Sequence, residues 1–294
     1  MYPLTMIKDL KAPGAAPAAK PAAKSTLPCY ETHPEFYRLD PFQIFGNLYY
    51  VGDQKACPQL IDTGDGLILI DTGYGPEAEF LMENIRTLGF RLEDIKIIIH
   101  SHGHYDHFGA TNRIKAICGA KVYMSRVDTQ LLREKPERAL LSHSFDPNAT
   151  IPWPDVEIDD GDHIRLGNTD ILCRLAPGHT PGTLCFFFHV TDGEKTYRVG
   201  YWGGVGLNQM KKDFCYQHDM PQGAFGTMLE TIQKLWDEPV DITLGNHPPQ
   251  NATLEKRAWM LEHPGSNPFL DKACWHAQLT ALKINCEKAI ELGY

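Results

Sequence analysis

One short stretch of this sequence gathers three imidazoles and a carboxylate. His102, His104, Asp106 and His107 form a His-x-His-x-Asp-His array. Packing these groups together without an ion between them would be costly, and neutral imidazole and carboxylate are good zinc ligands. A solvated polar loop would explain a single histidine, but this spacing favours a metal site. The array therefore predicts metal-dependent chemistry.

The elements around the array indicate how it is positioned. Residues 95–99 form an apolar, β-branched run that is typical of a buried strand. Residues 108–118 have the apolar spacing of a helix and are followed by Gly119. The array is thus predicted to occupy a strand-to-helix turn at the carboxyl edge of a sheet, where functional groups are commonly presented.

Two further histidines follow predicted strands within turns rich in glycine and proline. His179 lies in Ala-Pro-Gly-His-Thr-Pro-Gly, and His247 lies in Leu-Gly-Asn-His-Pro-Pro. Such rigid turns can hold an imidazole on a fixed backbone, as a preorganised site requires. With the array they total five histidines and one aspartate. That set is large enough for two zinc ions with open positions for water.

Length and composition limit the class of protein. The 294 residues, 43% hydrophobic and 22% charged, allow a substantial core. No apolar run reaches the length of about 20 residues that spans a bilayer. The net charge of −9 argues against nucleic acid as a partner. The eight cysteines contain no Cys-x-x-Cys pair, and we interpret them as buried thiols.

The amino terminus differs in composition from the rest. Residues 11–28 are rich in alanine and proline and predict a semi-extended arm or linker, either disordered or docked on a partner subunit in a homo-oligomer. We therefore predict an arm over residues 1–36 and a single catalytic domain over 37–294. Residues 1–24 lack the apolar core of a signal peptide, which favours a cytoplasmic location, or a periplasmic or secreted one if the sequence is a mature form.

The remaining pattern is one of strands and helices in layers, which predicts an α/β fold without an internal domain boundary. Its most regular feature is a repeated pentapeptide, Leu-Ile-Asp-Thr-Gly, at 60–64 and 69–73, predicted as two strands joined by a turn. Loops are predicted at 136–154 and 203–221. Further strands are predicted at 42–51 (a hairpin), 121–124, 162–166, 169–175, 183–190, 196–202 and 241–244, and helices at 76–88, 125–134, 224–236, 252–262 and 269–291.

The array, the Pro-Gly-His179-Thr-Pro-Gly turn and the Leu-Ile-Asp71-Thr-Gly strand end resemble the metallo-β-lactamase superfamily. This resemblance implies an αβ/βα four-layer sandwich with the metals at one edge between the sheets. Within the superfamily, the chain is most similar to the third subclass of class B β-lactamases, in which no cysteine binds metal. That subclass opens the β-lactam ring, an activity that confers antibiotic resistance.

The resemblance also implies roles for individual residues. His102, His104 and His179 would bind the first zinc, and Asp106, His107 and His247 the second. Asp71 would orient the ligands. Asp62, in the twin pentapeptide, is expected only to start a turn.

The implied mechanism is metal-assisted hydrolysis. Zinc lowers the pKa of bound water from about 15.7 to about 7, which gives a hydroxide at neutral pH. That hydroxide would attack the carbonyl of a β-lactam or another strained ring. Asp106 would bind zinc, orient the nucleophile and pass a proton to the leaving group.

Residues 203–206, Gly-Gly-Val-Gly, depart from the family pattern. Many superfamily lactonases, thioesterases and phosphodiesterases carry a metal-bridging aspartate here, so its absence disfavours those activities. The β-lactamases of the third subclass usually offer a serine here that helps to bind the substrate carboxylate. Asn208, Lys211 or Lys212 are candidates to substitute for it, and His143 in the 136–154 loop is a further candidate to approach the substrate.

Three alternatives therefore remain open. The first is a zinc-dependent hydrolase of β-lactams, and the second a hydrolase of another cyclic amide, lactone or ester with at most incidental β-lactamase activity. The third is a non-enzymatic zinc protein or a flavodiiron-like redox protein. The redox version is disfavoured by His107 as a ligand and by the missing flavin domain.

Overall fold

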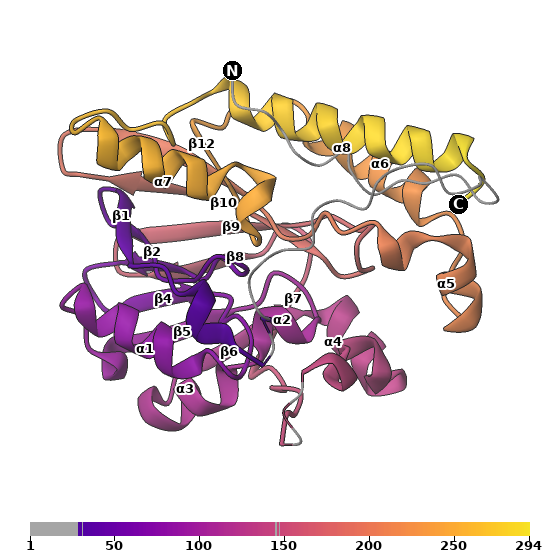
Figure 1. The fold of residues 1–294 in the computed structure, drawn as a ribbon, viewed down its shortest axis with the longest axis horizontal. Helices are drawn as coiled ribbons and strands as arrows, with labels where there is room; N and C mark the ends of the chain where they lie inside the picture. The colour runs from indigo at the N-terminus through magenta and orange to yellow at the C-terminus, as the bar shows by residue number, and fades with distance from the viewer. Residues whose placement is uncertain (1–28, 31, 145, 147) are drawn as a thin grey trace.

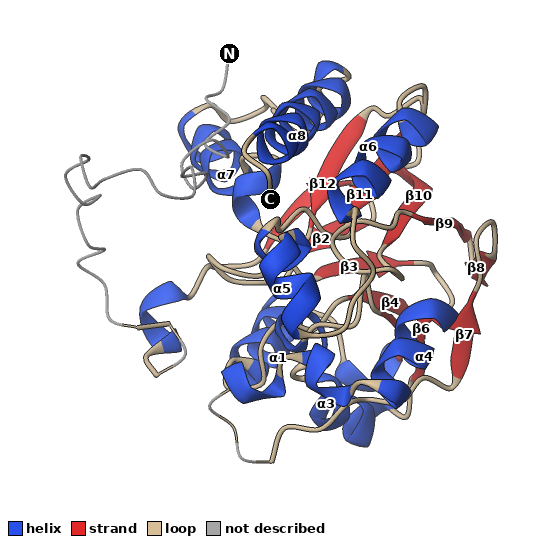
Figure 2. Ribbon diagram, turned by 90° about the vertical axis from the view of Figure 1, so that its right-hand side faces the viewer, coloured by secondary structure: helices blue, strands red, loops and turns tan. Residues whose placement is uncertain are grey.

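The computed structural model describes residues 29–30, 32–144, 146 and 148–294, which contain two packed β-sheets (Figures 1 and 2). The first sheet has seven strands in sequence order, antiparallel up to β4 and parallel from β4 to β7. Its strands are β1 (Phe42–Phe45), β2 (Leu48–Tyr50), β3 (Gln59–Asp62), β4 (Leu67–Ile70), β5 (Ile95–Ile99), β6 (Lys121–Ser125) and β7 (Val156–Ile158).

The second sheet has five strands in the order β12-β11-β10-β9-β8, antiparallel except for the parallel pair β11 and β12. Its strands are β8 (His163–Leu166), β9 (Thr169–Leu175), β10 (Leu184–Thr191), β11 (Thr196–Trp202) and β12 (Ile242–Gly245).

Helices cover the outer face of each sheet, as Figure 1 shows. One group, with the first sheet, comprises α1 (Ala78–Thr87), α2 (Tyr105–Phe108), α3 (Thr111–Cys118) and α4 (Arg126–Glu134). The other lies on the side of the second sheet and comprises α5 (Lys212–Gln217), α6 (Ala224–Leu235), α7 (Thr253–Glu262) and α8 (Ala273–Glu291).

Three apolar clusters match these layers. Between the sheets, Ile68 and Ile97 of the first pack in one cluster with Phe186 of the second. Outside the first sheet, Ile85 of α1 and Ile114 of α3 pack in a cluster with β4 and β5, and outside the second sheet α6 and α8 pack on β10 and β11. Strand β4 is buried at every position, as expected for a strand covered on both faces. The predicted αβ/βα four-layer sandwich is confirmed.

Most predicted elements are present, and the differences are local. The single helix predicted at 108–118 is two helices in the structure: α2, which begins at Tyr105 and carries Asp106 and His107, and α3. Strand β7 was not predicted, since its three residues depend on pairing with β6. Helix α5 lies within the stretch predicted to be irregular, because six residues give too little helical signal without tertiary packing.

The predicted arm lies mostly outside the described residues, which begin at Cys29. Tyr30 is buried, and its ring centroid lies 5.1 Å from that of Tyr37 and 4.7 Å from that of Tyr74. Packing onto the domain therefore starts before residue 37. The division at 36/37 and oligomerisation through the arm stay predictions. Among the described helices, none is both long and apolar enough to cross a membrane.

Candidate metal centre

The six candidate ligands meet where three strands end. His102 and His104 follow β5, His179 follows β9, and His247 follows β12. Asp106 and His107 are presented by α2, directly after the turn. Because β5 belongs to one sheet and β9 and β12 to the other, the site lies at an edge that the two sheets share.

His102, His104 and His179 form the first group of donor atoms. Nε2 of His102 lies 2.9 Å from Nδ1 of His104 and 3.1 Å from Nε2 of His179, and the last two atoms are 3.0 Å apart. Nitrogen ligands lie about 2.0–2.1 Å from zinc, so three nitrogens this close can surround one ion.

Hydrogen bonds to backbone carbonyls determine which ring nitrogen of His102 and of His179 faces the other ligands. Nδ1 of His102 donates to the Gly203 carbonyl at 2.7 Å, and Nδ1 of His179 donates to the Gly206 carbonyl at 2.7 Å. In neutral imidazoles the Nε2 atoms of both therefore carry lone pairs, which point at each other. Burial, together with neighbouring histidines, holds the pKa of His102 well below its usual value, and burial lowers that of His179 to about 4. A cation between them would satisfy both lone pairs.

Asp106, His107 and His247 form the second group. Oδ2 of Asp106 lies 3.2 Å from Nε2 of His107 and 3.3 Å from Nε2 of His247. Nδ1 of His107 donates to Asp71, and Nδ1 of His247 donates to the Lys55 carbonyl, so both Nε2 atoms face inward. Burial alone would lower the pKa of His107, but Asp106 and Asp71 raise it to about 10. The local field thus favours a positive charge here, which a metal ion can supply.

His102 also lies near the second group, with one donor atom within 4.8 Å of Asp106 and His107. Its Nε2 faces His104 and His179, however, and its Nδ1 is engaged by Gly203. We therefore place His102 in the first group and His247 in the second. His247 and Asp106 keep 34% and 22% of their side-chain surface exposed, so the second group lies at the open side of the site.

The buried carboxylate of Asp71 accepts hydrogen bonds from several residues around the two donor groups. It accepts from the Ser101 backbone N–H at 2.8 Å, from the Ser101 hydroxyl at 2.7 Å, from Nδ1 of His107 at 3.0 Å and from the Tyr201 hydroxyl at 2.9 Å. The side chain is 1% exposed, and its φ of +57° lies in the left-handed region, which aspartate tolerates. This arrangement matches the role predicted for Asp71. Asp62 accepts from the Gly64 N–H and forms the expected turn.

His100 lies beside Asp71 and outside both groups. Its Nε2 is 3.1 Å from the Thr111 hydroxyl, and its Nδ1 is 4.0 Å from Asp71. Burial lowers its pKa to about 4, so it is neutral at pH 7.

Sequence reasoning missed Asp128, which joins two of the ligand-bearing loops. Its buried carboxylate accepts from the Gly103 and Gly182 N–H groups and from the Thr180 hydroxyl, each at 2.8 Å. In the sequence, Ser125 and Asp128 read as the start of a helix, and Ser125 does cap α4 by accepting from the Asp128 N–H. Because a place at the start of a helix already accounts for Asp128, nothing in the sequence indicated its bonds to the two distant loops. Asn246, which donates to the Gly203 carbonyl at 2.5 Å, was missed as well.

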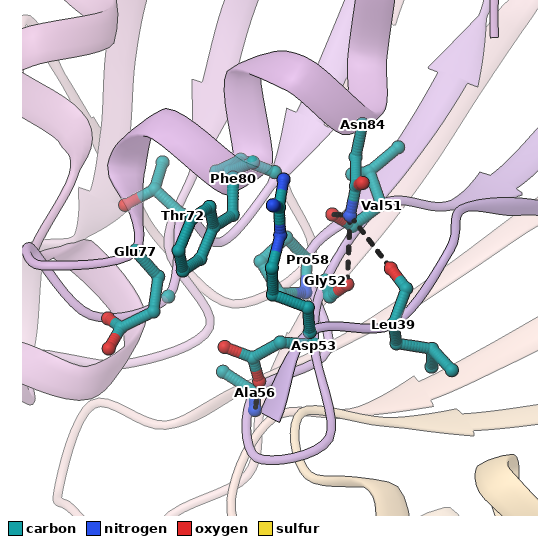
Figure 3. A pocket seen from close by; sticks show the side chains of 13 residues that line it. Leu39, Val51, Gly52, Asp53, Ala56, Pro58, Thr72, Glu77, Phe80 and Asn84 are labelled. Atoms are coloured by element: carbon teal, nitrogen blue, oxygen red, sulfur yellow. Dashed lines mark hydrogen bonds between the residues drawn. The ribbon is translucent and has the colours of Figure 1, made fainter. Parts of the chain in front are cut away.

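The loop after β2 supports His247. Asp53 accepts from the N–H groups of Lys55 and Ala56 at 2.6 and 2.9 Å and from the Tyr30 hydroxyl at 2.5 Å. This fixes the Lys55 carbonyl that orients His247 at 2.7 Å. Figure 3 shows Asp53 and Ala56 on one side of a small cavity, with Asn84 bonded to neighbouring backbone carbonyls on another.

Replacing Asp53 by alanine is expected to weaken metal binding at the second group about tenfold, the lower end for residues that orient a ligand. The reason is that the Lys55 carbonyl would lose its fixed position. Zinc affinity measured by competition with a chromophoric chelator would show it. Tyr30→Phe removes one donor to Asp53 but leaves the turn intact, so it should change the zinc affinity far less. Equal affinities in the parent protein, Asp53→Ala and Tyr30→Phe would contradict a role of Asp53 in orienting His247.

Gly204 and Gly206 lie directly against His179. A Cβ atom at Gly204 would come within 2.6 Å of the imidazole, and one at Gly206 within 2.8 Å. A side chain at Gly204 or Gly206 would thus collide with this histidine, and one at Gly203 would collide with the Leu184 carbonyl instead.

A cavity of about 640 Å³, partly open to solvent, adjoins His179. Its lining includes Arg138, Gln209 and Cys215. Asn208 and Lys211 are not among its lining residues, and the Lys211 ammonium lies 4.7 Å from the centre of the Tyr294 ring. Substrate binding by Asn208 and Lys211 stays a prediction.

Known proteins share both the sequence pattern and the fold. A family model for the metallo-beta-lactamase superfamily matches residues 60–193. The hydroxyacylglutathione hydrolase GloC of Haemophilus influenzae is 29% identical over 224 residues, which cover 74% of this chain and 93% of that protein.

Solved structures add the fold and the subclass. BJP-1, a subclass B3 metallo-β-lactamase of Bradyrhizobium japonicum, is 28% identical with a TM-score of 0.74 over 87% of this chain and 95% of that one. FEZ-1, the metallo-β-lactamase of Legionella gormanii, is 25% identical with a TM-score of 0.77 over 87% of this chain and 97% of that one.

These findings, with the histidine-rich edge, define a metal-dependent hydrolase. Residues 60–193 match the metallo-β-lactamase superfamily model, and the resemblance to the B3 subclass is confirmed.

Proposed function

We propose that this chain is a dizinc hydrolase that opens the β-lactam amide bond. The observation that carries the proposal is the pair of donor groups with inward-facing lone pairs, made from histidines and one aspartate. Imidazole and carboxylate ligands suit zinc. The similarity to B3 β-lactamases supports the choice of substrate.

The chain's own residues would share the chemistry as follows. Zinc bound here would supply a hydroxide at neutral pH and polarise the substrate carbonyl. Asp106, only 22% exposed, would orient the nucleophile and pass its proton to the leaving nitrogen. Asp71, Gly203 and Gly206 would keep the imidazoles in the tautomers that leave their lone pairs inward.

Hydrolysis of an ester, thioester or lactone is the second candidate. It is favoured by the similarity to a hydroxyacylglutathione hydrolase. The residues after β11 weigh against it, because Gly203–Gly206 offer no carboxylate that could bind metal, and His179 leaves no room for a side chain at Gly204 or Gly206.

Metal content and a substrate panel test the proposal together. We expect about two zinc ions per chain and chelator-sensitive turnover of a chromogenic cephalosporin, above that of an acyl-homoserine lactone or a glutathione thioester. Turnover of the lactone or thioester without turnover of the cephalosporin would support the second candidate, hydrolysis of an ester, thioester or lactone. Less than about one zinc per chain would contradict the two-metal site, and substantial iron would favour a redox protein.

A further inference from the structure

Arg138 is a buried cation, two of whose guanidinium nitrogens have no hydrogen-bond acceptor among the residues that the structure describes. It lies in the 3₁₀ turn Pro136–Ala139 after α4 and is 3% exposed. Within the part of the chain that the structure describes, its buried Nε and Nη1 atoms have no acceptor. Burying a charged group without a partner is costly, so an arginine held in this state calls for an explanation.

The neighbouring groups do not neutralise Arg138. The nearby carboxylate of Asp128 is engaged by Gly103, Gly182 and Thr180, and no ion pair joins it to Arg138 among the described residues. The guanidinium carbon lies 4.8 Å from the centre of the Phe214 ring. Besides Asp128, the thiol of Cys215, the exposed Glu137 and the buried imidazole of His104 interact with it electrostatically.

Arg138 lines the cavity that adjoins His179, and a second unpaired polar group lines it too. Oε1 of Gln209 is buried and has no partner among the described residues. The ends of this amide can exchange by a flip, so Gln209 can present either an acceptor or a donor to a ligand. An ion pair of 2.9 Å between Lys135 and Asp219 joins the segment after α4, which carries Arg138, to the segment after α5.

We infer that Arg138, with Gln209, binds a carboxylate of the substrate and so directs the reacting bond toward His179. A guanidinium pairs well with a carboxylate, and the bond gains strength in a partly enclosed cavity. The orientation of the reacting bond rests on the proposed hydrolase function, whereas binding of the carboxylate does not. The inferred substrate class is therefore anionic, with a carboxylate in the same molecule as the bond that is cleaved.

Benzylpenicillin and its methyl ester test this inference, because they share the reacting amide and differ in the carboxylate. For Arg138→Gln we expect KM for the acid to rise about 10- to 100-fold, the effect of one hydrogen bond to a charged group, with kcat nearly unchanged. KM for the ester should hardly change. Arg138→Lys keeps the positive charge but loses the planar donors. Its KM for the acid should therefore lie between that of the parent protein and that of Arg138→Gln. Arg126→Gln, a matched change at an exposed arginine of α4, should leave both substrates unaffected.

A stability measurement separates binding from a structural role. Because Nε and Nη1 of Arg138 have no acceptor among the described residues, Arg138→Gln should leave the thermal midpoint unchanged or raise it. A lower midpoint with equal losses for acid and ester would overturn the inference, as would unchanged KM for both. If neither lactam is hydrolysed, the proposed function fails. Calorimetric binding of benzylpenicillin against its ester would then decide the role of Arg138, and equal binding of both would overturn it.

Discussion

Replacing His102 with alanine is expected to lower kcat/KM for a chromogenic cephalosporin about a thousandfold or more. This histidine holds the first group together, since its Nε2 lies 2.9 Å from His104 and 3.1 Å from His179. Losing a metal held by these residues would remove several kcal/mol of charge stabilisation, and each 1.36 kcal/mol corresponds to about a tenfold change in rate. The zinc content should fall together with the rate, as elemental analysis of the purified variant would show.

His189→Ala is the matched control, because this histidine is exposed on β10 and far from the ligand-bearing turns. It should keep the full zinc content and activity. If His102→Ala fails to fold, His179→Ala tests the same group, since His179 lies at its partly exposed side. Retention of both zinc and activity in either variant would contradict the assignment.

Removing the carboxylate of Asp71 is expected to have the second largest effect. Asp71→Ala would leave Ser101, His107 and Tyr201 without their shared acceptor. Breaking such a buried group typically costs about 3–5 kcal/mol of unfolding free energy. Asp71→Asn keeps the shape and tolerates the positive φ but loses the charge that orients His107, so zinc affinity should fall about 10- to 100-fold.

Asp62→Asn provides the control, because it makes the same change in the twin pentapeptide, where the side chain only caps a turn. Chemical denaturation and zinc competition should both leave it close to the parent protein. Similar losses of stability and zinc affinity in the Asp62 and Asp71 variants, or no loss in either, would contradict the different roles given to the two pentapeptides.

The acid stability of the metal-free protein offers a separate measurement on Asp71. Burial would raise the pKa of its carboxyl, but His107 and the hydrogen bonds of Ser101 hold it below the usual value. A depressed pKa stabilises the fold above the unfolded value of about 3.9, and this stabilisation is lost as the pH falls through the folded value. In metal-free Asp71→Asn, the free energy of unfolding should no longer fall over this pH range.

The sequence determined the features that depend on local chain geometry. The apolar run before His102 and the glycine and proline turns around His179 and His247 were enough to place these side chains at strand ends. The close spacing of the array favoured a metal by itself, because the chain brings those groups together whatever the rest of the fold does. The layered α/β architecture followed from the same alternation of strands and helices.

Only the tertiary structure decided how distant segments meet. His102 and His179 are 77 positions apart, and the pairing of strands within two sheets brings their lone pairs face to face. The same packing gave Asp128 its link between two loops, crowded Gly204 against His179 and left two buried nitrogens of Arg138 without an acceptor among the described residues. These roles arise from contacts between segments far apart in the chain, so no local pattern of residue types could have revealed them.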